Sequence, residues 1–597
     1  MSTNINSKNH IAELLALARS KKATQIASQV PIEPPQIATP KTLAERIAAI
    51  RAAKIPVINT HVISINTQPD TQPDQLTNVD KYGNTITYNT EQTAFVNLIR
   101  SRKSCILIGA AGTGKTTTIR GAVELLIREL GIAPLSNQTT HKHLIAGTPG
   151  ICCVAYTRRA VNNIKKAMPT ELSPNCITIH KLLEYGPVYY EAIDDKGNVK
   201  TTMRFEPARN SYNPLPYEID CLIIDEASMV SIELYSLVMD ALSHSMQIIF
   251  VGDIEQLPPV FGSAILGYKM LELPTIQLTQ VYRQALESPI IRLAHRILSG
   301  NPIPVEEYPQ WRFPDELTIR EWKRSVDADT ALLTIAQLIY SYIDAGIYNC
   351  EDDAILIPYN KACGTDELNK RIGNYLARKN EAITYEVIAG FIRSYYSVGD
   401  KVLYDKEDAI ITSIATNPNY FGAKPKTESS TLDYWGNDSS LTTNKYSNQL
   451  APLDDTDVDK YLDALSNNDS SLTREASHII TLRMLDSDTT ISINTSGQIN
   501  SMLFGWALTV HKAQGSEWGK VFLFIHKSHA TMIQRELLYT ACTRARKELF
   551  ILCEHDTFTK GILNQRIVGN TLAEKAEYFK GKKENGNSSY IPSNKER

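Results

Sequence analysis

The chain has 597 residues, with 62 basic and 65 acidic side chains and a net charge of −3. This length allows several domains, and the near-neutral charge means that any nucleic-acid surface must be local. Its nine cysteines form no Cys-x-x-Cys pairs, which predicts a protein without zinc in a reducing compartment. No apolar run could span a bilayer, and residues 1–10 lack a signal-peptide core. We therefore expect a soluble, cytoplasmic protein with no membrane partner.

Residues 1–80 are predicted to form a flexible N-terminal extension. Two similar helical patterns lie within it, at 11–22 and 43–54, and Pro-rich stretches separate and follow them. Such stretches do not pack into a core. Two interpretations remain open: a solubilising arm, or a duplicated helical peptide within residues 9–55 that binds a partner protein through an apolar face.

Residues 81–275 alternate strand and helix patterns, as a parallel α/β domain does. Within them, the sequence GAAGTGKTT follows an apolar run at 105–108 and opens into a helical pattern. Glycines let the backbone wrap round phosphates, and the N–H groups at a helix start attract the anion. The pattern predicts a nucleoside triphosphate site with Mg²⁺. Its residues are Gly109, Ala110, Ala111, Gly112, Thr113, Gly114, Lys115, Thr116 and Thr117.

In this site, Lys115 is expected to reach the β- and γ-phosphates, and Thr116 to bind Mg²⁺. A second apolar strand ends in Asp225 and Glu226, where α/β sheets hold their ligands. Asp225 would complete the Mg²⁺ shell, and Glu226 would orient and deprotonate the attacking water. A third strand leads to Gln256, placed to sense the γ-phosphate and that water. Taken alone, these ends could be an acidic surface turn and a Pro-stiffened turn.

The remaining boundaries come from changes in pattern. Residues 183–217 contain a predicted β-hairpin, with strands at 188–193 and 199–205 round a turn at 194–198. A second α/β domain is expected from two segments, 276–394 and 506–580. A β-rich insert at 395–505 separates them, with a polar stretch at about 415–475 that has few large aliphatic residues. Residues 581–597 form a polar tail.

Successive motifs resemble those of superfamily 1 helicases, in the order in which that family carries them. After Gln92 and the phosphate loop come AYTRR at 155–159, TIHK at 178–181, DEAS at 225–228, GDIEQLPPV at 252–260, QVYRQ at 280–284, TVHKAQGSE at 509–517 and YTACTRAR at 539–546. The resemblance is strongest to the RecD and phage Dda branch, whose members move 5′ to 3′ on single-stranded DNA. It spans about residues 85–555.

The resemblance implies an α/β fold with two RecA-like parallel-sheet P-loop domains. The hairpin would be a strand-separating pin, called domain 1B, and the insert an SH3-like domain 2B. ATP with Mg²⁺ would bind between the two domains, and single-stranded or forked duplex DNA would bind across them. The implied protein is a monomer that acts in replication, recombination or repair.

The same resemblance implies roles that spacing does not reveal. Gln92 would read adenine, Tyr282 would pack on the base, and Glu517 would contact the ribose. Arg283 and Arg544 would reach the γ-phosphate from the second domain, where a guanidinium stabilises charge on the transferred group. Without the motif, each arginine could equally be part of a surface salt bridge.

Predicted DNA contacts lie at strand ends in both α/β domains. Hydroxyl, imidazole and ammonium groups suit phosphate and sugar contacts, and a histidine can also stack on a base. Each histidine could instead be a buried hydrogen-bonding residue. The predicted contacts are Thr157, Arg158, Thr178 and His180 in the first domain, and Thr509, His511 and Lys512 in the second.

We therefore expect an ATP-dependent DNA helicase. Two other activities stay open: an RNA helicase of the same superfamily, and an ATP-driven translocase that remodels protein–DNA complexes with little unwinding. A nuclease is disfavoured because the sequence shows no further cluster of carboxylates.

Overall fold

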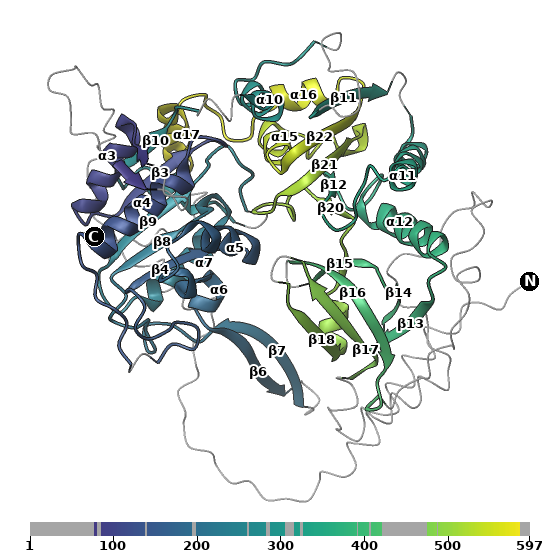
Figure 1. Cartoon of the computed structure of the whole chain (residues 1–597), viewed down its shortest axis with the longest axis horizontal. Coiled ribbons are helices and arrows are strands. Elements are labelled where there is room, and N and C mark those ends of the chain that lie inside the picture. Colours follow the sequence, from purple (N-terminus) through teal and green to yellow (C-terminus); the bar gives the residue numbers. More distant parts are fainter. Residues whose placement is uncertain are drawn as a thin grey trace, which may run out of the picture.

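The computed structural model shows three lobes, a first domain, a second domain and an insert (Figure 1). It describes residues 77–79, 85–137, 140–193, 199–259, 262–281, 287–304, 316–322, 326–390, 392–404, 407–420, 475–485 and 488–584. Predicted features outside these residues are the extension at 9–55, the turn at 194–198, Tyr282, Arg283 and the tail beyond 584. Among the described residues, no helix combines the length and the apolar character that a bilayer crossing needs.

The first domain contains six parallel strands in the order β10-β3-β9-β8-β4-β5. Their bounds are β3 Cys105–Gly109, β4 Ile151–Ala155, β5 Cys176–Thr178, β8 Cys221–Ile224, β9 Gln247–Gly252 and β10 Thr275–Leu278. Helix α3 Thr90–Arg100 precedes these strands, and the helices between them are α4 Lys115–Arg128, α5 Arg158–Ala167, α6 Ile179–Leu182, α7 Ile232–Ala241 and α8 Ile265–Lys269. Two short strands, β1 Thr77–Val79 and β2 Thr85–Thr87, precede this sheet.

Alternate residues of the strands other than the edge strand β10 enter two separate cores, one on each face of the sheet. Ile106 and Ile108 of β3 belong to one core, and Cys105 and Leu107 belong to the other. Because both faces are covered, the strands are apolar throughout rather than alternating with polar residues. This burial explains why the run before the phosphate loop is recognisable from sequence.

The first domain extends beyond its predicted end at residue 275. Strand β10 pairs with β3, from Thr275 opposite Ile106 to Leu278 opposite Gly109. It lies at the edge of the sheet and is only partly buried, so its apolar pattern is weak. The predicted boundary is therefore too early by at least these residues.

The second domain has five parallel strands in the order β11-β22-β21-β12-β20. Their bounds are β11 Leu317–Trp322, β12 Ala354–Ile357, β20 Ala507–Thr509, β21 Trp518–Ile525 and β22 Ala545–Glu554. The helices are α10 Pro289–Leu298, α11 Ala328–Asp344, α12 Thr365–Lys379, α15 Arg535–Cys542 and α16 Thr557–Leu563. Strands from before and after the insert thus share one sheet, as the interrupted pattern predicts.

The insert is an antiparallel β structure that begins earlier than the predicted residue 395. Its five-stranded sheet has the order β18-β17-β16-β15-β19, and the pair β13 and β14 packs beside it. Val387 of β13 and Tyr396 of β14 share a core with Ile411 and Leu482. The bounds are β13 Thr384–Ala389, β14 Ile392–Ser397, β15 Lys401–Tyr404, β16 Glu407–Thr416, β17 Glu475–Met484, β18 Thr490–Thr495, α14 Ser496–Asn500 and β19 Leu503–Phe504.

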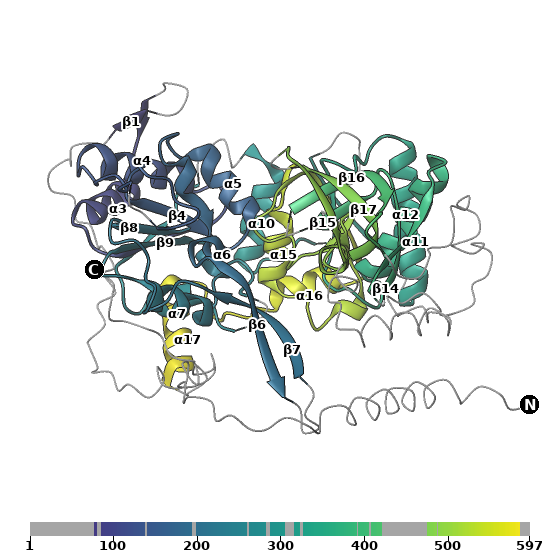
Figure 2. The same cartoon turned by 90° about the horizontal axis from the view of Figure 1, so that it is seen from below.

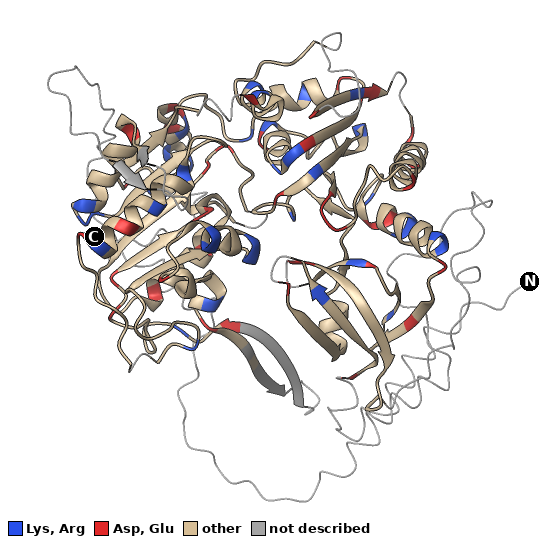
Figure 3. Cartoon of the chain, in the orientation of Figure 1, with Lys and Arg blue, Asp and Glu red and all other residues tan. Residues whose placement is uncertain are grey.

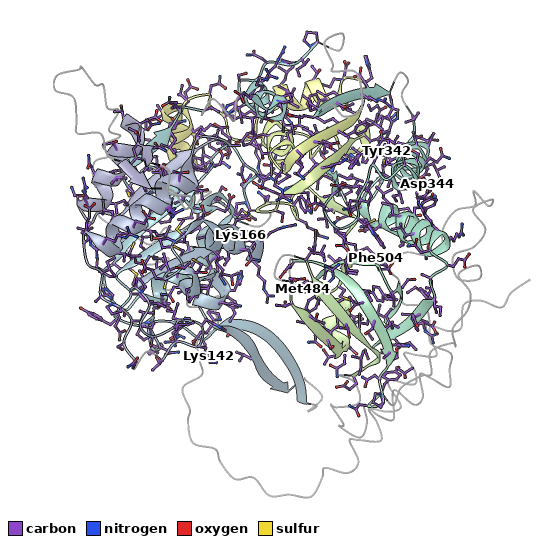
Figure 4. All side chains as sticks on the ribbon, viewed as in Figure 1. Lys142, Lys166, Tyr342, Asp344, Met484 and Phe504 are labelled. Atoms are coloured by element: carbon purple, nitrogen blue, oxygen red, sulfur yellow. The ribbon has the colours of Figure 1, made fainter. Side chains whose placement is uncertain are left out.

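The insert meets the second domain at Phe504, which packs against the cores of both (Figure 4). Its start at about 384 depends on contacts between β13 and β17, which are far apart in sequence. Of the predicted polar stretch at 415–475, strands β16 and β17 occupy the two ends, and residues 421–474 lie outside the described residues. The SH3-like classification of the insert stays a prediction.

The predicted hairpin projects from the first domain (Figures 1 and 2). Strands β6 Tyr185–Ile193 and β7 Val199–Pro207 pair antiparallel along their whole length. At its base, Arg209 Nε donates to Glu184 Oε2 at 2.9 Å, and the N–H of Lys142, labelled in Figure 4, donates to Glu184 Oε1 at 2.6 Å. Burial opposes ionisation of Glu184, but these hydrogen bonds and the Arg209 charge hold its pKa below the usual value. The two ends of the hairpin are thus joined by a buried ion pair.

The last described helix, α17 Leu572–Glu584, departs from the predicted domain plan. It follows the second domain in sequence, yet Leu572, Tyr578 and Phe579 pack with the core of the first domain. Figures 1 and 2 show it against that domain. The assignment of residues 506–580 to the second domain is therefore wrong for α17, and the predicted tail at 581–597 begins with its last turn. The contacts responsible are long-range and leave no local pattern.

A stability prediction arises in the insert, where Asp400 is buried and accepts a hydrogen bond from Ser397 N–H at 2.7 Å. Burial raises the pKa of Asp400 to about 7. The folded state then keeps a proton that the unfolded chain releases above its ordinary pKa, so stability falls as pH rises from about 4 to about 7. We expect Asp400→Asn, which keeps the acceptor oxygen, to stabilise the insert at pH 8 by up to about 4 kcal/mol.

The same variant should stabilise the insert less at pH 5, by about 1.5 kcal/mol, because the unfolded carboxyl has lost its proton there while the folded one has kept it. Calorimetric unfolding midpoints at the two pH values measure the difference. Equal shifts at pH 5 and pH 8 would show that Asp400 does not carry this proton.

Candidate nucleotide and DNA site

The loop between β3 and α4 has the backbone shape that the phosphate-loop pattern predicts. Gly112 and Gly114 have φ angles of 80° and 83°, which strain a residue that bears a side chain. A Cβ on Gly109 would collide with Thr113 Oγ1. The loop leads directly into α4, whose first N–H groups and dipole favour an anion.

Lys115 and Thr116 begin that helix. Lys115 Nζ donates to the carbonyl oxygens of Gly109 and Ala110, at 2.5 and 3.1 Å, so its ammonium group lies within the loop. A phosphate oxygen is a stronger partner for an ammonium group than a neutral carbonyl. Thr116 is exposed beside it and offers a hydroxyl oxygen. Both side chains therefore suit the roles predicted for them.

Asp225 and Glu226 follow the buried strand β8 and face the same loop. Glu226 has left-handed backbone angles, φ 49° and ψ 42°, a conformation that is unfavourable for non-glycine residues and is enriched at functional sites. Burial and the charge of Asp225 raise the pKa of Glu226 to about 7, against the opposing charges of Arg544 and Lys115. Burial also raises the pKa of Asp225, while Lys115 lowers it. A carboxylate with a pKa near neutrality can exchange a proton with water.

Gln256 lies in the loop after β9 and is 6% exposed. Its Oε1 is buried and has no hydrogen-bond partner among the described residues. A buried amide oxygen without a partner is unfavourable, which is common where a ligand or water is to be bound. The backbone N–H of Gln256 donates to the carbonyl of Asp253 at 3.2 Å. The loop therefore fixes the backbone of Gln256, and its side-chain oxygen remains available to a ligand or water.

Tyr539 of α15 connects the second domain to this loop and to the phosphate loop. Its hydroxyl accepts from the Ala111 N–H at 2.9 Å and donates to Asp253 Oδ2 at 2.5 Å. The neighbouring Thr540 Oγ1 accepts from the Leu257 N–H at 3.0 Å. The sequence motif at 539–546 does not reveal this role of Tyr539, because its partners lie more than 280 residues away.

Arg544 follows α15 and is buried in the second domain. It donates to the carbonyls of Thr540 and Ser516 at 3.0 and 3.2 Å, and to Thr543 Oγ1 at 3.0 Å. Its charge acts on Glu226 across the junction between the domains. Arg544 therefore lies close enough for its charge to act on Glu226, and its contact with the γ-phosphate stays a prediction. Its predicted companion Arg283, like Tyr282, lies outside the described residues.

The residues predicted to hold the base and the ribose have mixed outcomes. Gln92 is fully buried, and its Nε2 donates to Thr118 Oγ1 at 3.0 Å. Its Oε1 accepts from the Asn89 N–H at 3.1 Å, which closes a capping box at the start of α3. This structural role was missed, although Asn followed three residues later by Gln is a recognisable capping signal. Glu517 is exposed, and its contact with ribose stays a prediction.

The three threonines predicted to contact DNA all cap helical turns at the ends of strands. Thr157 Oγ1 accepts from Ala160 N–H and Thr178 Oγ1 from Lys181 N–H, each at 3.2 Å, and Thr509 Oγ1 accepts from Lys512 N–H at 3.4 Å. Capping uses an oxygen lone pair and leaves the hydroxyl proton to donate to a phosphate.

The loops predicted to contact DNA in the two domains lie against each other. A Cβ on Gly515, six residues after Thr509, would come within 2.6 Å of Thr157 Oγ1. Figure 3 shows basic residues along α5 and α6 on the side of the first domain that faces the other lobes. Lys165 and Lys166 are exposed there, and Figure 4 labels Lys166. The His180 ring lies 5.5 Å from that of Tyr156 and 5.1 Å from that of Tyr185, at the base of the hairpin.

His511 and Arg158 are half-buried at these loops, and Lys512 is exposed. Burial lowers the pKa of His511, and the charge of Arg566 lowers it further, which favours a neutral imidazole. A neutral ring can donate a hydrogen bond or stack, but it adds no charge to attract a phosphate. The positive potential of this surface therefore depends on its lysines and arginines.

A junction of all three lobes, missed from sequence, lies beside this surface. Asp408 of the insert is fully buried and accepts from Trp518 Nε1 at 3.0 Å. Arg159 of α5 lies 3.5 Å from its carboxylate and 4.6 Å above the Trp518 ring, and Lys401 lies at 3.4 Å. Burial disfavours the charge of Asp408, but these partners hold its pKa below the usual value. The insert is thus positioned against both α/β domains.

Two family models match this chain over the parts that form the site. Residues 92–262 match a model described as an AAA domain, and residues 504–552 match the UvrD-like helicase C-terminal domain. The first match contains the phosphate loop, Asp225, Glu226 and Gln256. The second contains Thr509, Tyr539 and Arg544.

The curated relatives of this chain include a named DNA helicase and a RecD subunit. The chain is 27% identical to the ATP-dependent RecD2 DNA helicase of Deinococcus radiodurans over 482 residues, which cover 81% of this chain and 51% of the relative. It is 25% identical to the RecBCD enzyme subunit RecD of Buchnera aphidicola, over 76% of this chain and 71% of the subunit. The chain therefore spans about half the length of the first relative and most of the second.

Among solved structures, the chain resembles Pif1 helicase from Bacteroides in complex with ADP-AlF3 and ssDNA. The TM-score is 0.42 at 16% identity, over 84% of this chain and 98% of that one. This is a distant likeness, and the two family models and the RecD relatives are the stronger matches. In these matches the chain is similar to superfamily 1 ATP-dependent helicases, and its RecD relatives support the RecD-like branch of that superfamily.

Proposed function

We propose that this protein is an ATP-driven DNA helicase that moves 5′ to 3′ along single-stranded DNA and unwinds forked duplex. The observation that carries the proposal is the contact of α15 with the phosphate loop through Tyr539. This contact joins the nucleotide site to the second domain, so a change at the phosphates alters how the domains meet. The resemblance of the sequence motifs to the RecD and Dda branch supports the direction, and the name of the Deinococcus relative supports the DNA substrate.

In the hydrolysis step, Lys115 holds the β- and γ-phosphates and Glu226 takes a proton from the attacking water. Gln256 orients that water with its unpaired amide oxygen, and Arg544 stabilises charge on the transferred phosphoryl group. Thr116 and Asp225 supply oxygen ligands of the kind that Mg²⁺ prefers, and Mg²⁺ would neutralise phosphate charge there. Arg283 is proposed as a second arginine with the same task.

Movement would follow from alternating grip on the strand. Thr157 and Thr178 hold phosphates from the first domain, and Thr509 does so from the second. Because Gly515 packs directly against Thr157, any opening between the domains moves the phosphate contacts of the first domain away from those of the second. ATP binding would then favour the closed arrangement and hydrolysis would release it, which is a shift of population driven by differential affinity. The hairpin would separate the second strand.

The direct test measures ATP hydrolysis and unwinding by the full-length protein on matched DNA and RNA duplexes with single-stranded tails. The proposal expects hydrolysis stimulated by single-stranded DNA and ATP-dependent unwinding of the DNA duplex. Equal or better unwinding of RNA would favour the RNA helicase. Stimulated hydrolysis without unwinding of either duplex would favour the remodelling translocase.

A further inference from the structure

Helix α17 gives the chain a second crossing between the two α/β domains. The first crossing follows β10, and the second runs through residues 564–571 from α16 to α17. Phe579 is 4% exposed and meets Tyr268 edge to face, with ring centres 5.3 Å apart. A Cβ on Gly267 would collide with the Phe579 ring, so this position of α8 must be glycine. The helix is thus packed closely on the first domain.

The connecting segment is held by α15, the helix that carries Tyr539. Glu536 Oε1 accepts from the N–H groups of Arg566 and Ile567, at 3.0 and 2.8 Å. The side-chain Nε of Arg535 donates to the carbonyl of Ile562 at 2.9 Å. The backbone N–H of Arg535 donates to the carbonyl of Asn564 at 2.7 Å. Displacement of α15 is therefore transmitted to the segment that leads into α17.

From α17, Lys575 reaches the loop that carries Gln256. Lys575 is 1% exposed, and its Nζ lies 2.9 Å from Glu255 Oε2. Burial raises the pKa of Glu255, and the Lys575 charge opposes that rise. A buried ammonium group is costly unless it is paired, and the loss of one partner leaves the other charge uncompensated. This ion pair therefore constrains both α17 and the loop.

Other hydrogen bonds from the C-terminal part of the chain also reach this loop. Tyr539 bonds Asp253, Thr540 bonds Leu257 N–H, and Gln514 Nε2 donates to the Leu257 carbonyl at 2.5 Å. Each of these holds an end of the loop. Within the described part of the chain, Lys575 is the only side chain that forms a hydrogen bond with the Glu255 carboxylate, at the middle of the loop.

We infer that Lys575 is a positioning residue for ATP hydrolysis. Through Glu255 it holds Gln256 in the position that faces the attacking water, and α17 couples that position to α15. The inference rests on the proposed function, because it assigns Gln256 to that water. It adds a C-terminal helix to the parts that couple the two domains. Misplacement of a reacting group by about 1 Å can cost about a hundredfold in rate, so a modest shift of the loop matters.

The test compares three variants of the full-length protein. Lys575→Met keeps most of the side-chain volume but leaves the Glu255 carboxylate unpaired. We expect a fall of about tenfold to a hundredfold in the kcat of DNA-stimulated hydrolysis, with little change in the KM for ATP or in single-stranded DNA affinity. Adding Glu255→Met replaces the ion pair by two apolar side chains and should restore most of the kcat. Lys583→Met, which removes a half-exposed ion pair of the same helix with Glu272, is the control and should leave kcat unchanged.

An unchanged kcat in Lys575→Met would overturn the inference. A double variant as slow as the single variant would also overturn it, and so would a KM for ATP that rises as much as kcat falls. Hydrogen exchange at the Leu257 amide gives a readout that does not need activity. It should be faster in Lys575→Met and return to the wild-type rate in the double variant. If the wild type lacks DNA-stimulated hydrolysis, the proposed function fails, while the exchange result still decides whether Lys575 holds the loop.

Discussion

Glu226→Gln is expected to lower the kcat of DNA-stimulated ATP hydrolysis by about 10²- to 10⁴-fold, the range that a positioned general base contributes. Glu226 is held in a left-handed backbone conformation beside Asp225 and Lys115, and burial brings its pKa to about 7. Glutamine keeps the size and the hydrogen-bonding capacity of the side chain, but it does not accept a proton from water. Lys115 and the phosphate loop are untouched, so ATP and DNA should still bind.

The matched control is Glu129→Gln, at an exposed glutamate that pairs with Arg100 on the surface of the same domain. Exposed pairs contribute at most about 1 kcal/mol, so this variant should hydrolyse ATP like the wild type. Initial rates with saturating single-stranded DNA and nucleotide titrations measure both properties. Near-normal hydrolysis by Glu226→Gln would remove this residue from the mechanism.

Arg544→Ala is expected to lower kcat about 10³-fold, which is the second large effect. This loss is at the lower end of the rate enhancement that a phosphate-contacting arginine provides. Arg544 belongs to the second domain, and its charge reaches Glu226 in the first. The loss should appear in kcat more than in the KM for ATP, because the guanidinium acts on charge that develops during transfer.

Arg546→Ala controls for charge and position in the same motif. Arg546 is exposed and pairs with Asp352, so its removal should change the rate by less than about twofold. Arg544 also bonds two carbonyls of its own domain, and unfolding midpoints are needed to show that each variant is folded at the assay temperature. A folded Arg544→Ala protein with normal kcat would mean that hydrolysis does not need the second domain.

The parts of the site that could be predicted from sequence are those with local causes. The phosphate loop needs glycines at positive φ between a buried strand and a helix, and all three features are adjacent in the chain. Asp225, Glu226 and Gln256 follow apolar strands, and the parallel sheet brings those strand ends together. Arg544 was placed by resemblance to a family, since no local pattern distinguishes it from a surface arginine.

What could not be predicted depends on contacts between distant segments. Tyr539 meets Ala111 and Asp253, and Lys575 meets Glu255, each across more than 280 residues. Helix α17 has charged residues on several sides and no strong apolar stripe, so nothing in its own sequence indicates that it packs on the first domain. The same reason explains the early start of the insert, where β13 is recruited by β17.

The central claim is that ATP hydrolysis at this interdomain site drives the protein 5′ to 3′ along DNA. The most direct measurement is ATP-dependent unwinding of two forked substrates that share one duplex, one with only a 5′ single-stranded tail and one with only a 3′ tail. The account predicts strand separation of the 5′-tailed substrate by the wild type, and none by Glu226→Gln. Preferential unwinding of the 3′-tailed substrate, or equal unwinding without ATP, would contradict it.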